Sequence, residues 1–138
     1  MRKEQFAKNH FYHVFNRGVD KRIIFKSEAD FYRFYLSMYA FNDENFHNST
    51  GKSTLSSLRI SVTDERKPFV RILSFCLLPN HFHLLLQQLL PEGITNFMHR
   101  LGMGYARYFN TRHERTGCLF QGRFRAVHIK RDAQFIHI

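Results

Sequence analysis

The distribution of apolar residues predicts a strand and then a helix near the start of the chain. Residues 11–16, Phe-Tyr-His-Val-Phe-Asn, are rich in aromatic and β-branched side chains, and Gly18 suits a turn that would close this strand. Ser27 can cap the start of a helix with its side-chain oxygen. Just after it, apolar side chains recur at three- and four-residue spacing from Phe31 to Phe41. This spacing predicts an amphipathic helix of about four turns.

The middle of the chain predicts a surface connection followed by a β-hairpin. Residues 42–68 are mostly polar and are expected on the surface, although residues 58–62 alternate like a short edge strand. Residues 69–78 form a nearly continuous apolar run, which is typical of a central strand. Pro79-Asn80 then turns the chain, and residues 81–88 return as a second central strand.

The last third predicts a helix, a strand and the start of another helix. Apolar residues from Ile94 to Phe109 fall on one helical face, and this helix is expected to end around Thr116-Gly117. Residues 123–129 alternate as a fourth strand. Residues 131–138 begin like a helix and stop within it, so we expect the chain to be truncated inside its last element.

This order of elements predicts the fold class. Strand, helix, strand, strand, helix, strand, helix matches the α+β, ferredoxin-like split βαβ pattern, with a four-stranded antiparallel sheet and helices on one face. A length of 138 residues indicates one domain covering 1–138.

Several classes of protein are disfavoured by composition. The sequence has no apolar run long enough for a membrane helix and no apolar signal core at its start, so we expect a cytoplasmic protein without a membrane partner. Two cysteines, Cys76 in a predicted buried strand and Cys118 in a basic loop, give no disulfide framework. Gly51-Lys52-Ser53 resembles the end of a phosphate-binding loop, but the required preceding glycine is replaced by Phe46.

The charge distribution indicates a polyanionic partner. The 21 Lys and Arg residues outnumber the 11 Asp and Glu residues, which gives a formal net charge of +10. Between residues 97 and 131 the only acid is Glu114, and this asymmetry favours binding to a phosphate backbone. The candidate DNA-binding residues in this tract are Arg100, Arg107, Arg112, Arg115, Arg123 and Arg125.

The strongest candidate for chemistry is the pair His81 and His83. Residues two apart in a strand point to the same face, so both imidazoles can contact one ion. Two ligands are too few for structural zinc, but suit a divalent ion that keeps waters and binds a phosphate substrate. The alternative is that both histidines simply face water or bond locally.

Such a site would also need an attacking group. An activated water, a serine or a tyrosine could attack a phosphodiester. Tyr105 and Tyr108 lie on the predicted second helix, but their helical spacing favours core packing.

Three segments resemble one known family. Pro79-Asn80-His81-Phe82-His83-Leu84-Leu85-Leu86, the stretch 11–18 and the stretch 117–124 together resemble the REP-associated tyrosine transposase branch of the one-tyrosine HUH transposases. The HUH motif consists of two histidines separated by one bulky hydrophobic residue, and Phe82 takes that middle position here. The motifs occur in the family order across nearly the whole chain.

The resemblance implies a single-strand DNA transposase domain. His81 and His83 would hold a divalent metal, Mg or Mn, and a tyrosine would attack the DNA to form a covalent phosphotyrosine intermediate. Single-stranded or hairpin DNA would be the partner, and because relatives include monomers and dimers, a homodimer stays open.

One departure from the family concerns the nucleophile. Residues 133–138 resemble the stretch just before the family's tyrosine, which would fall just after Ile138, so the chain as given is expected not to cleave DNA. The alternative is a non-catalytic module of ferredoxin-like fold that binds hairpin DNA or RNA. A reading frame with a tyrosine within about one helical turn after Ile138 would favour the enzyme.

Overall fold

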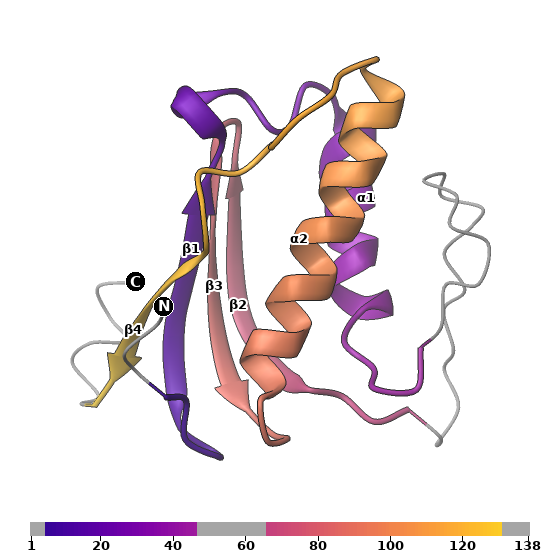
Figure 1. Cartoon of the computed structure of the whole chain (residues 1–138). Coiled ribbons are helices and arrows are strands. Elements are labelled where there is room, and N and C mark those ends of the chain that lie inside the picture. Colours follow the sequence, from indigo (N-terminus) through magenta and orange to yellow (C-terminus); the bar gives the residue numbers. More distant parts are fainter. Residues whose placement is uncertain (1–4, 47–65, 131–138) are drawn as a thin grey trace.

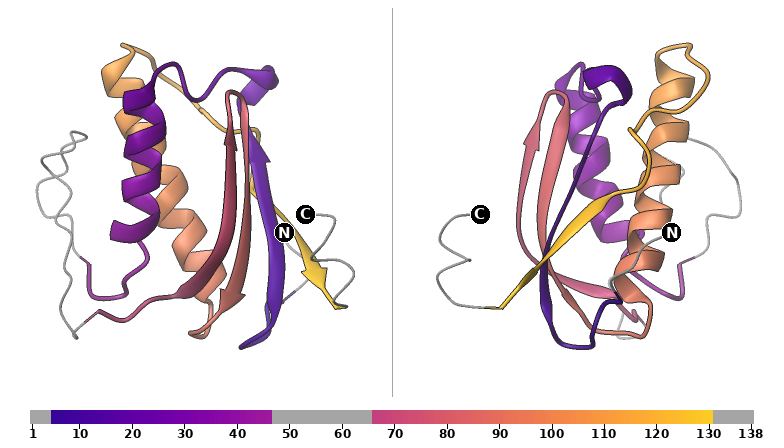
Figure 2. Two further views of the ribbon diagram at one scale, coloured as in Figure 1. Left: turned by 180° about the vertical axis from the view of Figure 1, so that it is seen from behind. Right: turned by 60° about the vertical axis from the view of Figure 1, so that its left-hand side comes forward.

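The structure is a computed structural model that describes residues 5–46 and 66–130, and it contains one sheet backed by two helices. The strands are β1 (Phe11–Arg17), β2 (Val70–Leu78), β3 (His81–Gln88) and β4 (Arg125–Ile129). The helices are α1 (Glu28–Ala40) and α2 (Gly93–Arg112), with a short 3-10 turn at Val19–Lys21. Both helices lie on the same side of the sheet (Figures 1 and 2). The α+β prediction is confirmed.

The sheet is antiparallel and has the strand order β2-β3-β1-β4. Strand β3 therefore lies between β1 and β2, while β1 lies between β3 and β4. Each helix connects two strands that are separated by a third, which is the interleaved βαβ arrangement expected from the order of elements. This topology places the start of β4 beside the end of β1.

The core lies between the sheet and the helices. Alternate residues of β3, Phe82, Leu84 and Leu86, are almost completely buried on the helix side. Tyr105 of α2 is also fully buried and donates a short hydrogen bond from its hydroxyl to the carbonyl oxygen of Ile24. The prediction that the aromatic residues of the second helix pack in the core is therefore confirmed. Among the described residues, no helix covers the opposite face of the sheet, which we call the open face (Figure 1).

Strand β2 is not central, which corrects the expectation from its apolar run. Among the four strands of the sheet it lies at one end, beside β3 alone. Its register shifts between Ile72 and Ser74, and Leu73 at this bulge is 45% exposed. Phe75 packs against Tyr35 of α1 with a ring-centroid distance of 5.8 Å. Cys76, expected to be buried, is exposed.

The first residues of the polar connection are buried rather than on the surface. The Asn42 side chain receives a hydrogen bond from the Val70 backbone nitrogen at 3.0 Å and donates one to the Val70 carbonyl at 2.7 Å. Asp43 accepts a hydrogen bond from the Lys67 backbone nitrogen at 2.9 Å. These polar side chains therefore join α1 to β2. The expected strand at 58–62 and the expected last helix lie outside the described residues.

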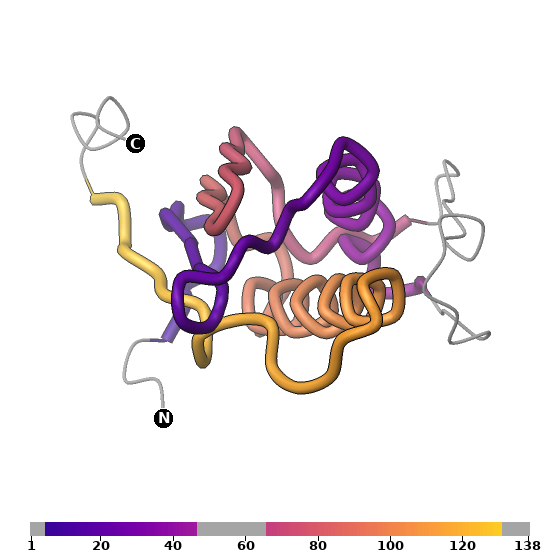
Figure 3. The backbone as a smooth tube through the Cα atoms, turned by 90° about the horizontal axis from the view of Figure 1, so that it is seen from above, coloured from indigo at the N-terminus to yellow at the C-terminus, as the bar shows by residue number. Residues whose placement is uncertain are grey.

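Helix α2 ends at Arg112, earlier than expected, and the chain then returns to the sheet along the end of β1 (Figure 3). We call residues 113–124, which connect α2 to β4, the return segment. Backbone hydrogen bonds hold it in place: the nitrogen of Val19 donates to the Leu119 carbonyl at 2.8 Å, and the nitrogen of Gln121 donates to the Arg17 carbonyl at 2.9 Å. Residues 119–122 are thus held beside residues 16–19, next to the candidate site.

Candidate active site

The two predicted histidines point to the open face of the sheet, near the turn between β2 and β3. His81 and His83 are half-buried, whereas Phe82 between them is buried on the helix side. Their rings lie edge to face with centroids 5.1 Å apart. The apolar side chains of β3 pack beneath the helices. Shifting the pairing of β3 by one residue would expose these side chains to water, so the pairing is fixed and both imidazoles stay on the open face.

Local hydrogen bonds orient both imidazoles. Nδ1 of His81 lies 2.7 Å from Oδ1 of Asn80, and an amide oxygen can only accept, so Nδ1 of His81 carries the hydrogen. Nε2 of neutral His81 then keeps its lone pair. Nδ1 of His83 lies 2.9 Å from Nε2 of His13 on β1, with the two rings stacked 5.0 Å apart. Metal-binding histidines are usually oriented by such hydrogen bonds on the other ring nitrogen.

The environment favours the neutral form of the inner histidines. Burial lowers the pKa of His83, and the charges that His13 and His81 would carry when protonated lower it further. Burial also lowers the pKa of His13. Neutral imidazole is the form that binds metal, so these shifts suit a metal ligand at neutral pH.

The histidines lie in a cleft of about 490 Å³ that also contains positive charge. We call it the histidine cleft, and its lining is Phe15, Asn16, Arg17, Lys21, Asn80, His81, His83, Gln121 and Arg125. Arg17 donates from Nε to Oε1 of Gln121 at 2.7 Å, which joins the end of β1 to the return segment. Three cations beside two imidazoles can bind a phosphate and a metal ion together.

The six predicted arginines do not form one surface. Arg125 lines the histidine cleft, and Arg123 lines a neighbouring cavity. Arg107 is exposed on α2, and Arg112 lies 3.6 Å from the buried carboxylate of Asp30.

The remaining two arginines bind backbone oxygens. Arg100 donates to the carbonyls of Asp43 and Phe46 at 3.2 and 3.3 Å. Arg115 donates to the Cys118 carbonyl at 2.8 Å. Such contacts support a structural role for both residues.

Among the imidazole and cationic side chains of the site, His13, Arg17 and Lys21 were not predicted from the sequence. His13 could have been placed on the open face, because it alternates with Tyr12 and Val14, but its partner depends on the pairing of β1 with β3. Arg17 and Lys21 surround the turn at Gly18, and nothing in their spacing indicates a cleft. They reach it because the backbone nitrogen of Gly18 bonds to the Asn80 carbonyl at 3.0 Å.

The described residues supply only part of a metal shell, and no tyrosine or serine among them lines the cleft. Within residues 5–46 and 66–130, no three His, Cys, Asp or Glu side chains gather closely enough to hold a metal. No tyrosine of these ranges lines the histidine cleft. Tyr105 and Tyr108 are buried in the core, and burial raises the pKa of Tyr108 to about 12. In the same part of the chain, no helix is sufficiently long and apolar to cross a bilayer.

Comparison with known proteins identifies the fold. No protein-family model matches the sequence, and no curated protein matches it. The solved structure of a REP-associated tyrosine transposase bound to a REP hairpin matches with a TM-score of 0.60 and 14% identity, covering 99% of this chain and 66% of that chain. A candidate transposase from Deinococcus radiodurans R1 matches with a TM-score of 0.56 and 12% identity, covering 99% and 92%. The resemblance seen in the motifs thus extends to the fold, which this chain shares with both proteins.

Proposed function

We propose that this chain carries the metal- and DNA-binding part of a single-strand DNA transposase. The observation that carries this proposal is the histidine cleft, where His81 and His83 share one face with Arg17, Lys21 and Arg125. The fold is that of a tyrosine transposase bound to a hairpin, which supports hairpin DNA as the partner. A strand with unpaired nucleotides beside a hairpin is the expected substrate.

The donor set of the cleft fits a hard divalent cation such as Mg or Mn. His81 would hold it through Nε2, because its Nδ1 donates to Asn80, and His83 would do so through Nε2 when its own Nδ1 donates to His13. When bound, such a cation withdraws charge from a phosphodiester. Two imidazoles leave most of the coordination shell to water and phosphate oxygens, as hard cations prefer.

The chain's own residues would bind and orient the DNA. Arg17, Lys21 and Arg125 neutralise the phosphate and hold it against the histidines. Gln121, bonded to Arg17, fixes the direction of the guanidinium. Attack on the phosphodiester by a tyrosine would form a phosphotyrosine and release a hydroxyl group of the DNA. No tyrosine of the described residues lines the cleft.

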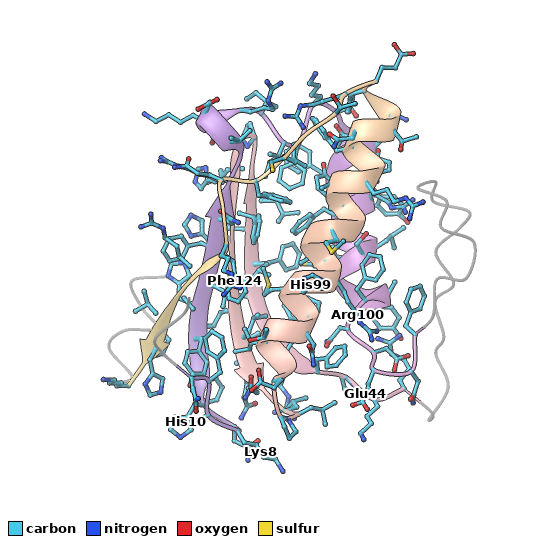
Figure 4. The ribbon with its side chains drawn as sticks, in the orientation of Figure 1. Lys8, His10, Glu44, His99, Arg100 and Phe124 are labelled. Carbon is cyan, nitrogen blue, oxygen red and sulfur yellow. The ribbon has the colours of Figure 1, made fainter. Side chains whose placement is uncertain are left out.

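Metal titration tests this function. Wild type, His81→Ala and His83→Ala would be titrated with Mn²⁺, followed by electron paramagnetic resonance, with and without hairpin DNA carrying a single-stranded tail. We expect each substitution to weaken metal binding at least tenfold, because changing even a residue that only hydrogen-bonds to a metal ligand typically lowers metal affinity by that factor. His10→Ala is the matched control, because His10 lies at the opposite end of β1 (Figure 4). Equal Mn²⁺ affinity in all four proteins would refute the metal site.

A non-catalytic hairpin-binding module is the alternative, since no tyrosine or serine of the described residues lines the cleft. Such a module needs no metal. Hairpin binding by wild type that persists without any detectable Mn²⁺ binding would therefore favour the module over the enzyme.

A further inference from the structure

A second cavity, of about 560 Å³, lies beside the return segment on the helix side of the sheet. We call it the α2 pocket, because residues of α2 form one of its walls. Asn16 lines both this pocket and the histidine cleft. The Asn16 side chain donates to the carbonyl of Gly122 at 3.2 Å, which fixes the boundary between the two cavities. They are therefore neighbours separated by the backbone of the return segment.

The lining of the α2 pocket suits an aromatic ring. Phe120 and Phe124 contribute partly exposed aromatic surface on one side, over the buried ring of Phe82. Gly102 and Ala106 of α2 contribute small residues to the lining. A Cβ atom built at Gly102 would have no heavy atom within 4 Å, so the helix backbone there faces open space. The volume lies in the range of about 300–1,000 Å³ that is usual for small-ligand sites.

Polar groups surround this apolar interior. Thr95 and His99 are exposed on α2, and neither makes a side-chain hydrogen bond within the described residues. Phe124 and His99 lie on facing sides of the space between the return segment and α2 (Figure 4). Arg123 adds an exposed cation to the lining, and Glu92, just before α2, adds an exposed acid. An aromatic slot with hydrogen-bonding groups and a cation is the combination that binds a nucleobase and its phosphate.

The two cavities are close enough to be occupied by one strand. Gln121 lines the histidine cleft and Arg123 lines the α2 pocket, and two residues of extended chain span at most about 7 Å. A strand crossing the return segment would therefore have cations on both sides of it. This continuity with a cationic cleft favours nucleic acid over a protein side chain as the occupant.

We propose that the α2 pocket holds one unpaired nucleobase of the DNA strand whose phosphate lies in the histidine cleft. This inference rests on the proposed function, and it adds a recognition site outside the reacting centre. The base stacks against the aromatic wall, while Thr95 and His99 are placed to bond its edge.

Gly102→Leu is the variant that tests the pocket. Its side chain would enter the open space at Gly102 without meeting backbone, and leucine favours a helix more than glycine does. The fold should therefore be kept, as thermal melting would show, while the pocket is filled. Gly102→Ala is the matched control, because a single methyl leaves most of the cavity open.

The probes are DNA hairpins with single-stranded tails of about six nucleotides on the 5′ or 3′ side, a length within usual binding-site sizes. Each tail would be made of dA, dC, dG or dT, and its bases would be removed one at a time. Binding is measured in EDTA, so that metal and cleavage do not contribute. We expect one abasic position to weaken wild-type binding roughly tenfold, as the loss of one stacked base would.

The variants then decide the outcome. Gly102→Leu should bind the intact tail roughly tenfold more weakly and lose its sensitivity to that abasic position, whereas Gly102→Ala should behave like wild type. Equal effects of all abasic positions in wild type, or an unchanged position dependence in Gly102→Leu, would overturn the inference. If wild type bound none of these DNAs, the proposed function itself would fail, and this inference with it.

Discussion

Replacement of His13 tests whether the hydrogen bond to His83 prepares a metal ligand. Nε2 of His13 lies 2.9 Å from Nδ1 of His83. If His83 donates this bond, its Nε2 is free to bind metal; if His13 donates, Nε2 of His83 carries the hydrogen instead. His13→Leu removes the acceptor with little change in size. We expect the hydrogen of neutral His83 to move away from Nδ1 in this variant.

The size of the effect follows from the loss of one supporting contact. Removing a hydrogen-bond partner of a metal-binding histidine typically weakens metal binding about 10- to 100-fold. This corresponds to about 1.4–2.8 kcal/mol of binding free energy, using about 1.4 kcal/mol for each factor of ten. His13→Gln should recover most of the affinity, because its amide oxygen can accept from Nδ1 of His83.

Two measurements separate positioning from a general effect on folding. Mn²⁺ titration gives the affinity, and long-range ¹H–¹⁵N correlation spectra show which nitrogen of His83 carries the hydrogen. The melting temperature should change little. Burial lowers the pKa of half-buried His13, so its side chain is neutral at neutral pH, and replacing it removes no charged contact. A His13→Leu protein with wild-type Mn²⁺ affinity, alongside a His81→Ala protein that loses it, would refute the reasoning.

Three further predictions concern pH, charge and packing. Burial and neighbouring charge lower the pKa of His83 from its usual 6.5, so its NMR titration midpoint should lie below 6.5. Folding stability should fall as the pH decreases below 6.5, because the unfolded chain takes up the proton first. A midpoint above 6.5 would contradict this. Arg100→Ala should lower the melting temperature through its lost carbonyl contacts, whereas Arg107→Ala should leave it unchanged but reduce the salt dependence of DNA binding by about one unit of slope. Gly93→Ala should cost about 1–3 kcal/mol of unfolding free energy, because its Cβ would lie 2.4 Å from the Phe69 carbonyl oxygen, while denaturant unfolding of Gly102→Ala should show no loss.

The parts of the fold that could be predicted are those with local signals. The hairpin turn at Pro79-Asn80 and the alternation of β3 place His81 and His83 on one face, and the structure confirms this face. The position of β2 was not predictable in the same way. An apolar run is typical of a strand buried on both faces, but β2 lies at the end of the described sheet, where Phe75 packs on α1 and Cys76 is exposed.

The composition of the cleft depended on tertiary structure that no local pattern contains. A surplus of arginine between residues 97 and 131 indicated a phosphate-binding surface, yet only the register of the sheet shows which side chains reach the histidines. Arg100 has the same sequence signal as Arg107, but its guanidinium binds two backbone carbonyls and lies 5.1 Å from the Phe69 ring. Arg17 had no such signal and lines the cleft.

One row of paired residues explains how the topology builds the site. Phe15 of β1 is opposite His83 of β3 on one side and opposite Arg125 of β4 on the other. His83 and Arg125 are therefore two strand spacings apart, about 10 Å, with Phe15 between them. An arginine side chain is long enough to reach across an aromatic ring toward a phosphate held at the histidines. The cation that was predicted from charge and the histidines that were predicted from spacing meet because β1 lies between their strands, so a variant that breaks the pairing of β1 with β4 should weaken DNA binding without changing any residue of the cleft.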